Sequence, residues 1–136
     1  MIQRIQTLWL LIAAACAIAS YKFAFYAGTN AKAVTGYELN ATENFGLMAA
    51  TGLIAGLAFL NIFLFKKRSL QIQLCILGIL LEAGLIYLYY REVQKFTAGT
   101  YALTAILHSV IVLCFFLAAR GIHKDSKIIK ESDRLR

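Results

Sequence analysis

The sequence predicts an all-α integral membrane protein: one domain built as a bundle of four transmembrane helices, with both termini in the cytoplasm. Three observations predict this fold class. Four apolar stretches are separated by three polar breaks, and each is close to the ~20 residues that a helix needs to cross a bilayer. The composition is 60% hydrophobic and 15% charged, whereas soluble domains are about 45–50% apolar. The basic residues gather on one side of the predicted membrane.

The predicted spans cover residues 5–25, 45–65, 70–90 and 101–119, followed by a basic tail over 120–136. Proline is absent, so no span has an obvious kink. The outer segment 27–44 is long enough to cap the bundle but too short to fold alone. A soluble helical protein is a poor alternative, because soluble helices need a polar face and these four have almost none.

The distribution of Lys and Arg predicts the orientation. Ten of these residues lie on the side that carries the termini and four on the other side, and basic residues near span ends stay in the cytoplasm. The short, purely basic turn at 66–68 is the strongest single determinant. The predicted cytoplasmic basic face consists of Arg4, Lys66, Lys67, Arg68, Arg120, Lys124, Lys127, Lys130, Arg134 and Arg136.

Glu82 and His108 are ionisable residues deep inside predicted spans, where such a residue is costly unless it is paired or faces a cavity. Counted from Tyr90 and Tyr101, both lie about 10–12 Å below the outer interface at ~1.5 Å per residue. We therefore predict a contact between Glu82 and His108 across two antiparallel helices. Its role is either a hydrogen bond that locks the helices together or a proton relay or ion site. Otherwise Glu82 is protonated or finds another partner.

Two further signals concern helix packing. Asn61 and Gln73 lie at matched depth near the inner face, and a bond between them would contribute about 1 kcal/mol. Ala49, Gly52 and Gly56 form a ridge of small residues, which lets two helix backbones approach closely. We expect the ridge to pack inside the bundle, with the seam of a homo-oligomer as the alternative.

Catalytic signatures are missing from the sequence: it has no Gly-rich phosphate loop, no Ser/His/Asp set and no C-x-x-C motif. Cys16, Cys75 and Cys114 lie inside spans, where thiols stay protonated, so we expect them to fill space. We expect no enzyme activity, no cofactor and no metal. The net charge of +7 comes from inner-face patches. These patches fit the anionic headgroups of the lipid bilayer and do not indicate nucleic acid.

The tail combines basic residues with a sparse apolar pattern. Ile122 and Ile129 share one helical ridge, and Ile128 and Leu135 share a neighbouring one. A short amphipathic helix could therefore lie on the inner leaflet or dock on a membrane or cytosolic protein partner. A solvated, frayed tail is the alternative.

Three segments carry a resemblance to a known family. They are the opening MIQRIQT, the turn FKKRSLQ at 65–71, and the end, ARGIHKD at 119–125 through SDRLR at 132–136. Together they resemble a domain-of-unknown-function family of small four-helix membrane proteins of Bacteroidota, and the likeness covers the whole chain. The resemblance implies an inner-membrane location in such a bacterium and implies no activity. Glu82 and His108 are not among the residues that carry it.

Two functional classes follow from these observations. The first is a multi-pass inner-membrane scaffold, assembly factor or accessory subunit that acts through its basic cytoplasmic face. The second is a small transporter or channel subunit with a Glu82/His108 proton or ion site inside the membrane. A water-filled cavity that reaches Glu82 would favour the second class. A dry bundle with an ordered helical tail would favour the first.

Overall fold

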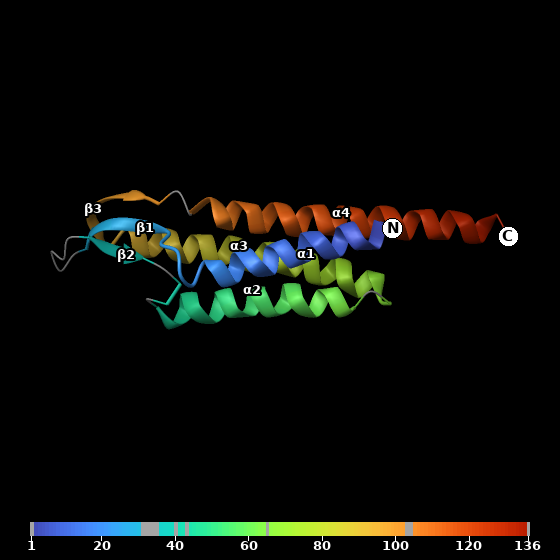
Figure 1. Cartoon of the computed structure of the whole chain (residues 1–136), viewed down its shortest axis with the longest axis horizontal. Helices are drawn as coiled ribbons and strands as arrows, with labels where there is room; N and C mark the ends of the chain where they lie inside the picture. Colours follow the sequence, from blue (N-terminus) through green and yellow to red (C-terminus); the bar gives the residue numbers. More distant parts are fainter. Residues whose placement is uncertain are drawn as a thin grey trace.

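The computed structural model describes residues 2–30, 36–39, 41–42, 44–64, 66–102 and 105–135, without the side chains of residues 2–4 and 30. In chain order the elements are α1 (Ile2–Ala19), β1 (Tyr26–Asn30), β2 (Tyr37–Leu39), α2 (Phe45–Phe63), α3 (Arg68–Val93), β3 (Phe96–Tyr101) and α4 (Ile106–Arg134). The four helices lie side by side in Figure 1, with the strands gathered beyond one end of the bundle.

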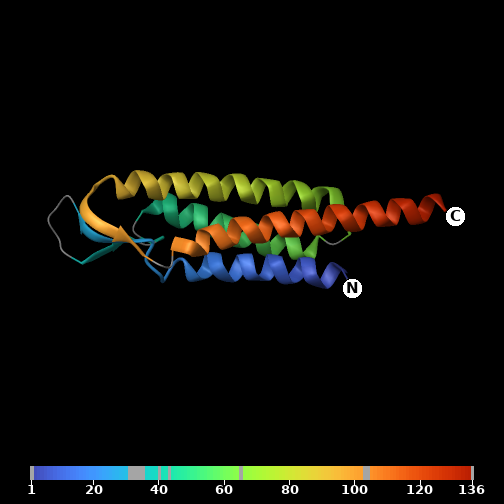
Figure 2. The same ribbon diagram turned by 90° about the horizontal axis from the view of Figure 1, so that it is seen from above.

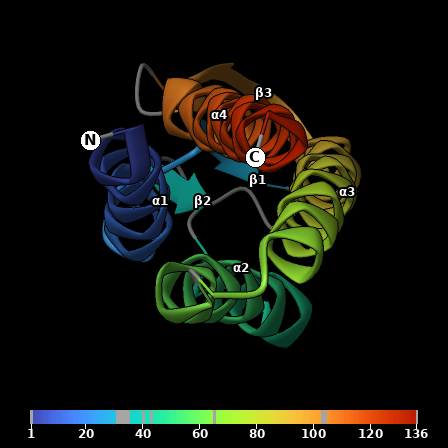
Figure 3. The same cartoon turned by 90° about the vertical axis from the view of Figure 1, so that its right-hand side faces the viewer.

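The predicted four-helix bundle is confirmed. Each helix packs against its neighbours in the chain, and α1 also packs against α4, which closes the ring seen end-on in Figure 3. Three of the helices, α2, α3 and α4, are long and apolar enough to cross a membrane, whereas the apolar part of α1 is shorter, Ile5–Ala19. Both termini lie at the end of the bundle away from the strands (Figure 2). We call the two ends the sheet end and the termini end.

A three-stranded antiparallel sheet with the order β2-β1-β3 covers the sheet end. No sheet was predicted from the sequence. β1 and β2 both lie in the first outer segment, but the third strand, β3, follows α3 and pairs with β1, about 70 residues earlier in the chain. Gly28 lies opposite Gly99 in this pairing. A side chain at Gly28 would collide with the backbone of Ala98 and Gly99, so the close approach of β1 and β3 requires glycine there.

Pairing of the strands also moves the ends of two predicted spans. The first helix ends at Ala19 rather than at Phe25, because the Phe25 N–H donates to Leu39 O at 2.7 Å in the sheet. The last helix begins at Ile106 rather than at residue 101. Tyr101 belongs to β3, and the Ala102 N–H donates to Phe25 O at 3.0 Å. Phe25 and Ala102, at the margins of the sheet, are therefore held by strand-type hydrogen bonds and not by helical ones.

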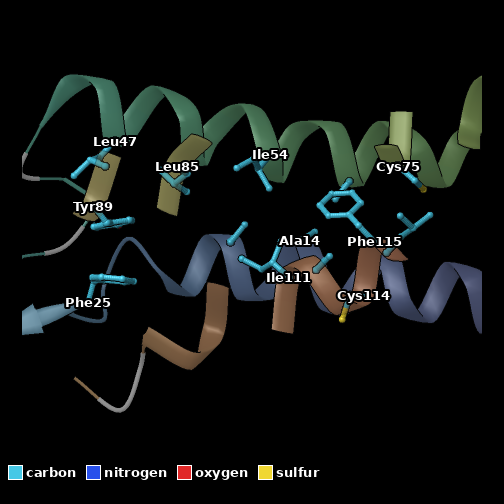
Figure 4. Packing of buried hydrophobic residues seen from close by; sticks show 14 of the residues in the cluster. Ala14, Phe25, Leu47, Ile54, Cys75, Leu85, Tyr89, Ile111, Cys114 and Phe115 are labelled. Carbon is cyan, nitrogen blue, oxygen red and sulfur yellow. The ribbon is translucent and has the colours of Figure 1, made fainter. Parts of the chain in front are cut away.

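The core is a narrow seam along the bundle axis, to which each helix contributes residues spaced three or four apart (Figure 4). The seam of α3 consists of Gln71, Cys75, Gly78, Glu82, Leu85, Tyr89 and Val93. As expected for space-filling thiols, Cys75 and Cys114 are buried there, and Cys16 is half-buried. The opposite sides of the helices carry large exposed apolar residues, as a surface facing lipid does.

The α3 helix packs tightly against α4 at Gly78. A Cβ atom at this position would lie 2.8 Å from Cε1 of Phe115, whose ring is fully buried. Buried side chains are packed too tightly for such a ring to shift at no cost. Gly84, on the same helix, is exposed and has open space where its Cβ would lie.

We expect Gly78→Ala to destabilise the bundle by about 1–3 kcal/mol, because the added methyl group overpacks the seam. Gly84→Ala is the matched control and should leave stability unchanged or raise it by up to about 1 kcal/mol through helix propensity. Thermal unfolding in detergent, followed by circular dichroism, measures both. Equal midpoints for the two variants would contradict the packing described at Gly78.

Candidate functional site

Glu82, midway along α3, meets His108 near the start of α4. His108 Nδ1 lies 2.6 Å from Glu82 Oε1, with Glu82 fully buried and His108 3% exposed. Glu82 lies on the seam face of α3 between Gly78 and Leu85, and His108 lies two residues inside the start of α4. The structure thus brings together the two residues that the depth argument paired.

Two aromatic rings lie between this pair and the sheet. Phe25, from the segment before β1, stacks on Tyr89 of α3 with ring centroids 4.4 Å apart and 17° between the planes. Figure 4 shows the two rings facing each other across the seam. The His108 ring lies 5.3 Å from Phe25 and 4.9 Å from Tyr89, measured between centroids. The imidazole is therefore held in place from the sheet end by aromatic packing.

Two polar atoms of this cluster have no hydrogen-bond partner among the described residues: Glu82 Oε2 and the Tyr89 hydroxyl. A buried polar group without a partner costs about 1–3 kcal/mol. A pocket of about 290 Å³ adjoins His108 and is lined by Phe25, Ile86, Ala105, Ile106, His108 and Ser109. The pocket reaches the imidazole, whereas Glu82 lies behind it, fully buried.

The chemistry open to this arrangement is that of a shared proton. When the Glu82 carboxyl is ionised, the Nδ1–H of His108 donates to Oε1 in a short charge-assisted hydrogen bond. When the carboxyl is protonated, its O–H can donate to a neutral Nδ1. Either form ties α3 to α4, and the cluster can exchange a proton only where water reaches it.

Asn61 is buried as predicted, but its partner is Gln71 and not Gln73. The Asn61 amide donates to Gln71 O at 3.2 Å and lies 3.0 Å from Cys75 Sγ. The Gln71 amide donates to Asn61 O at 3.0 Å. Gln73 is exposed, because two residues at ~100° each turn its side chain away from the seam that contains Gln71. Matched depth alone did not distinguish between the two glutamines.

The ridge of small residues faces outward, so the expectation that it packs inside the bundle is wrong. Ala49, Gly52 and Gly56 are all exposed, because α2 uses a different stripe for the seam. The ridge forms one wall of an apolar groove between α2 and α3, of about 820 Å³, with leucines of α3 opposite. Gly52 leaves room for Tyr21, whose hydroxyl donates to Met48 O at 2.7 Å.

The described members of the basic face lie at the termini end. Lys66 and Lys67 are exposed in the turn between α2 and α3, and Arg68 Nη2 lies 3.4 Å from Asp125 Oδ2 of α4. The Arg4 side chain and all of Arg136 lie outside the described part of the structure. The remaining members are exposed side chains of α4: Arg120, Lys124, Lys127, Lys130 and Arg134.

The tail is an uninterrupted continuation of α4 through Arg134. Ile122 is still buried in the bundle at 1% exposure, so the tail leaves the bundle later than residue 120. We call residues 123–134 the arm. It extends past the other helices at the termini end (Figure 1). Its side chains are exposed except for half-buried Asp125 and Ser126. The alternative of a frayed tail does not describe this helix.

Two residues of these sites escaped the sequence analysis. Tyr89 joins the Glu82 cluster because it lies seven residues further along the same helix face, a spacing readable in the sequence. Gln6 is buried between α1 and α4, and its Nε2 has no partner among the described residues. A glutamine in the first predicted span was a visible signal, since a buried amide needs a partner.

A comparison with known families matches residues 2–135 to the family described as Domain of unknown function (DUF4293). No curated protein matches the chain. No solved structure matches it either.

A double-mutant cycle tests whether Glu82 and His108 stabilise each other. We expect Glu82→Gln and His108→Asn each to destabilise the protein, and the double variant to lose less than the sum, with an interaction of about 0.5–3 kcal/mol. Denaturant titration in detergent measures the free energy of unfolding. Glu38→Gln, at an exposed residue of β2, combined with His108→Asn, is the control pair and should be additive. Additivity in the Glu82/His108 cycle itself would rule the interaction out.

Proposed function

This chain belongs to the DUF4293 family, and we propose that it is a non-catalytic scaffold, assembly factor or accessory subunit of a membrane complex. In this proposal the arm is the part that binds the partner. The observation that carries it is the unbroken passage of α4 from the bundle into a basic, exposed helix. The Glu82/His108 cluster is then a structural lock within the bundle.

The length of α4 supports a role outside the membrane. Its 29 residues extend for roughly 43 Å at ~1.5 Å per residue, whereas the hydrocarbon core is ~30 Å thick. The arm therefore projects from the bundle into a region where it can meet another macromolecule. Because it continues a packed helix, it needs no new helix nucleus, so it can stay helical without a partner.

Contacts at the base of the arm hold its direction. Arg68, at the start of α3, pairs with Asp125, and both side chains are largely buried, with 22% and 13% exposed. Ile122 packs in the seam one turn earlier. A helix held at two points presents a defined surface, and this preorganisation lowers the entropic cost of binding a partner.

The exposed side chains of the arm suit a protein surface. Ile128 and Ile129 are 45% and 41% exposed, and Lys127 and Lys130 flank them along the chain. The apolar pair suits a hydrophobic groove, which is the usual receptor for an amphipathic helix, and acidic side chains at the rim of such a groove would complement the two lysines. The outward ridge of α2 offers a separate surface for a membrane helix or for a second copy of this chain.

The charge distribution and the family resemblance support a proposed location. The positive-inside rule favours a cytoplasmic position for the basic termini end, and with it a cytosolic position for the arm. The resemblance to a family from Bacteroidota supports the inner membrane of a bacterium. The proposed role is therefore to hold a cytosolic or membrane partner at the inner face of that membrane.

The first prediction from this proposal is that removal of residues 126–136 abolishes recovery of a partner. The protein is purified from native membranes in mild detergent through a tag in the loop between β1 and β2, and mass spectrometry identifies what copurifies. We expect a stoichiometric partner with the full chain and at least tenfold less with the truncated chain. The truncation keeps Asp125 and its bond to Arg68, so the bundle stays intact.

A matched pair of charge variants controls for general electrostatics. Lys127→Gln with Lys130→Gln removes two exposed charges from the arm, whereas Lys22→Gln with Arg91→Gln removes two from the sheet end. Only the arm variant should lose the partner. Recovery of the protein alone, or only as its own oligomer, would overturn the proposal.

A second candidate function rests on the buried cluster. We propose as the alternative that the chain is a small transporter or channel subunit in which Glu82 and His108 form a proton or ion site. The unpaired Glu82 Oε2 and the pocket beside His108 favour it. In this mechanism water entering the pocket delivers a proton to the imidazole, which passes it to the carboxylate at 2.6 Å.

Proton flux into liposomes tests this alternative. If it holds, liposomes with the wild-type protein acidify faster under an inward proton gradient than empty liposomes, and Glu82→Gln lowers that rate at least tenfold. Glu38→Gln, in the exposed part of β2, is the control and keeps the rate. A pH-sensitive dye inside the liposomes gives the measurement. A wild-type rate equal to that of empty liposomes removes this candidate and leaves the scaffold proposal in place.

A further inference from the structure

A small pocket lies between α1 and α4 at the termini end, at the base of the arm and away from the Glu82 cluster. It has a volume of about 280 Å³ and is lined by Gln6 and Trp9 of α1, Arg120 and Lys124 of α4, and the apolar side chains beside them. We infer that this pocket binds the phosphate of an anionic phospholipid headgroup. The inference deepens the proposed function, on which it rests for placing the basic face at the inner leaflet.

Gln6 is the feature that points to a ligand. Its side chain is only 5% exposed, yet Nε2 has no hydrogen-bond partner among the described residues. An amide donor buried in this way costs free energy unless something accepts its hydrogen bond. Gly121 makes room for the amide, since a Cβ there would lie 3.1 Å from Cγ and 3.5 Å from Nε2 of Gln6. The pocket thus contains a buried donor for which the described residues supply no acceptor.

The charges around Gln6 specify an anion. Arg120 and Lys124 line the same pocket one helical turn apart, and no acidic side chain lines it. Asp125, the carboxylate next in sequence, is paired with Arg68 of α3. Guanidinium, ammonium and amide groups donate hydrogen bonds to phosphate oxygens, and an Arg side chain can donate two parallel ones.

The depth of the pocket favours a lipid over free phosphate. Arg120 is the first charged residue of α4 after the apolar stretch that ends at Ala119, so the pocket spans the boundary between hydrocarbon and headgroups. Leu117 and Ile5 line its apolar side, where the glycerol and acyl chains of a lipid would lie. Trp9 lines it as well, and tryptophan prefers this interface. Basic pockets between helices at this level bind anionic headgroups.

Trp9 also supplies the measurement, because it is the single tryptophan of the chain. The full-length protein is reconstituted in phosphatidylcholine vesicles that contain a minor fraction of phosphatidylglycerol or phosphatidylcholine with brominated acyl chains. When a brominated lipid binds beside Trp9, its bromine atoms quench the fluorescence of Trp9. We expect binding of phosphatidylglycerol to be at least about tenfold tighter than that of phosphatidylcholine, as the two favourable charge contacts with Arg120 and Lys124 imply.

Two charge-matched variants identify the site. Arg120→Gln with Lys124→Gln should abolish the selectivity, so that the two lipids bind about equally. Lys127→Gln with Lys130→Gln removes the same charge from the arm and should keep the preference for phosphatidylglycerol. Gln6→Leu should also lower the selectivity without changing the net charge. Unchanged selectivity in the Arg120/Lys124 variant, or equal loss in both charge variants, would overturn the inference, since the effect would then be absent or non-specific.

Inorganic phosphate distinguishes the two sources of the same chemistry. Millimolar phosphate added to the vesicles should leave the quenching by brominated phosphatidylglycerol unchanged if the site is built for lipid. Full competition would show a site for free phosphate and overturn the assignment to lipid. The lipid measurement requires no protein partner. Failure of partner capture with lipid selectivity intact therefore contradicts only the scaffold proposal, and the reverse outcome contradicts only the lipid site.

Discussion

Water is absent from the hydrocarbon core of a bilayer, so every backbone N–H and C=O group there must find its partner within the protein. Most of this chain meets the requirement with four helices. Where the chain leaves α1 and where it approaches α4, strand-type hydrogen bonds at the sheet end replace helical ones. The Phe25 N–H donates to Leu39 O, and the Ala102 N–H donates to Phe25 O. This pairing decides where α1 ends and where α4 begins. It also holds Phe25 against Tyr89 and His108. The hydrogen bonds that satisfy the backbone therefore also position the aromatic rings around the buried cluster.

The apolar bilayer also explains why the buried core is only a narrow seam. Lipid is as apolar as leucine, so burial of apolar surface does not drive these helices together, and close packing and polar contacts must hold them. The polar contacts are made along α3. Gln71 exchanges hydrogen bonds with Asn61 of α2 near the start of α3, and Glu82, near the middle of α3, contacts His108 of α4. Between them Gly78 lets the backbone approach the Phe115 ring.

The two ends of the bundle differ in chemistry, and the proposals divide accordingly. The sheet end is aromatic, with Tyr26, Phe96 and Tyr101 packed edge to face across β1 and β3. The termini end is basic and carries both the arm and the Gln6 pocket. The scaffold proposal rests on the arm, and the lipid proposal rests on the pocket at the base of the arm.

The sequence by itself determined the four helices, their apolar character and the contact between Glu82 and His108, because span length, hydropathy and depth below the interface are properties of single segments. Only the tertiary structure decided the rest. The sheet joins segments about 70 residues apart. The choice of Gln71 over Gln73, and the outward turn of Gly52 and Gly56, depend on the rotation of each helix about its own axis. Depth along a helix can be counted from a sequence, but rotation is set by the neighbours against which the helix packs.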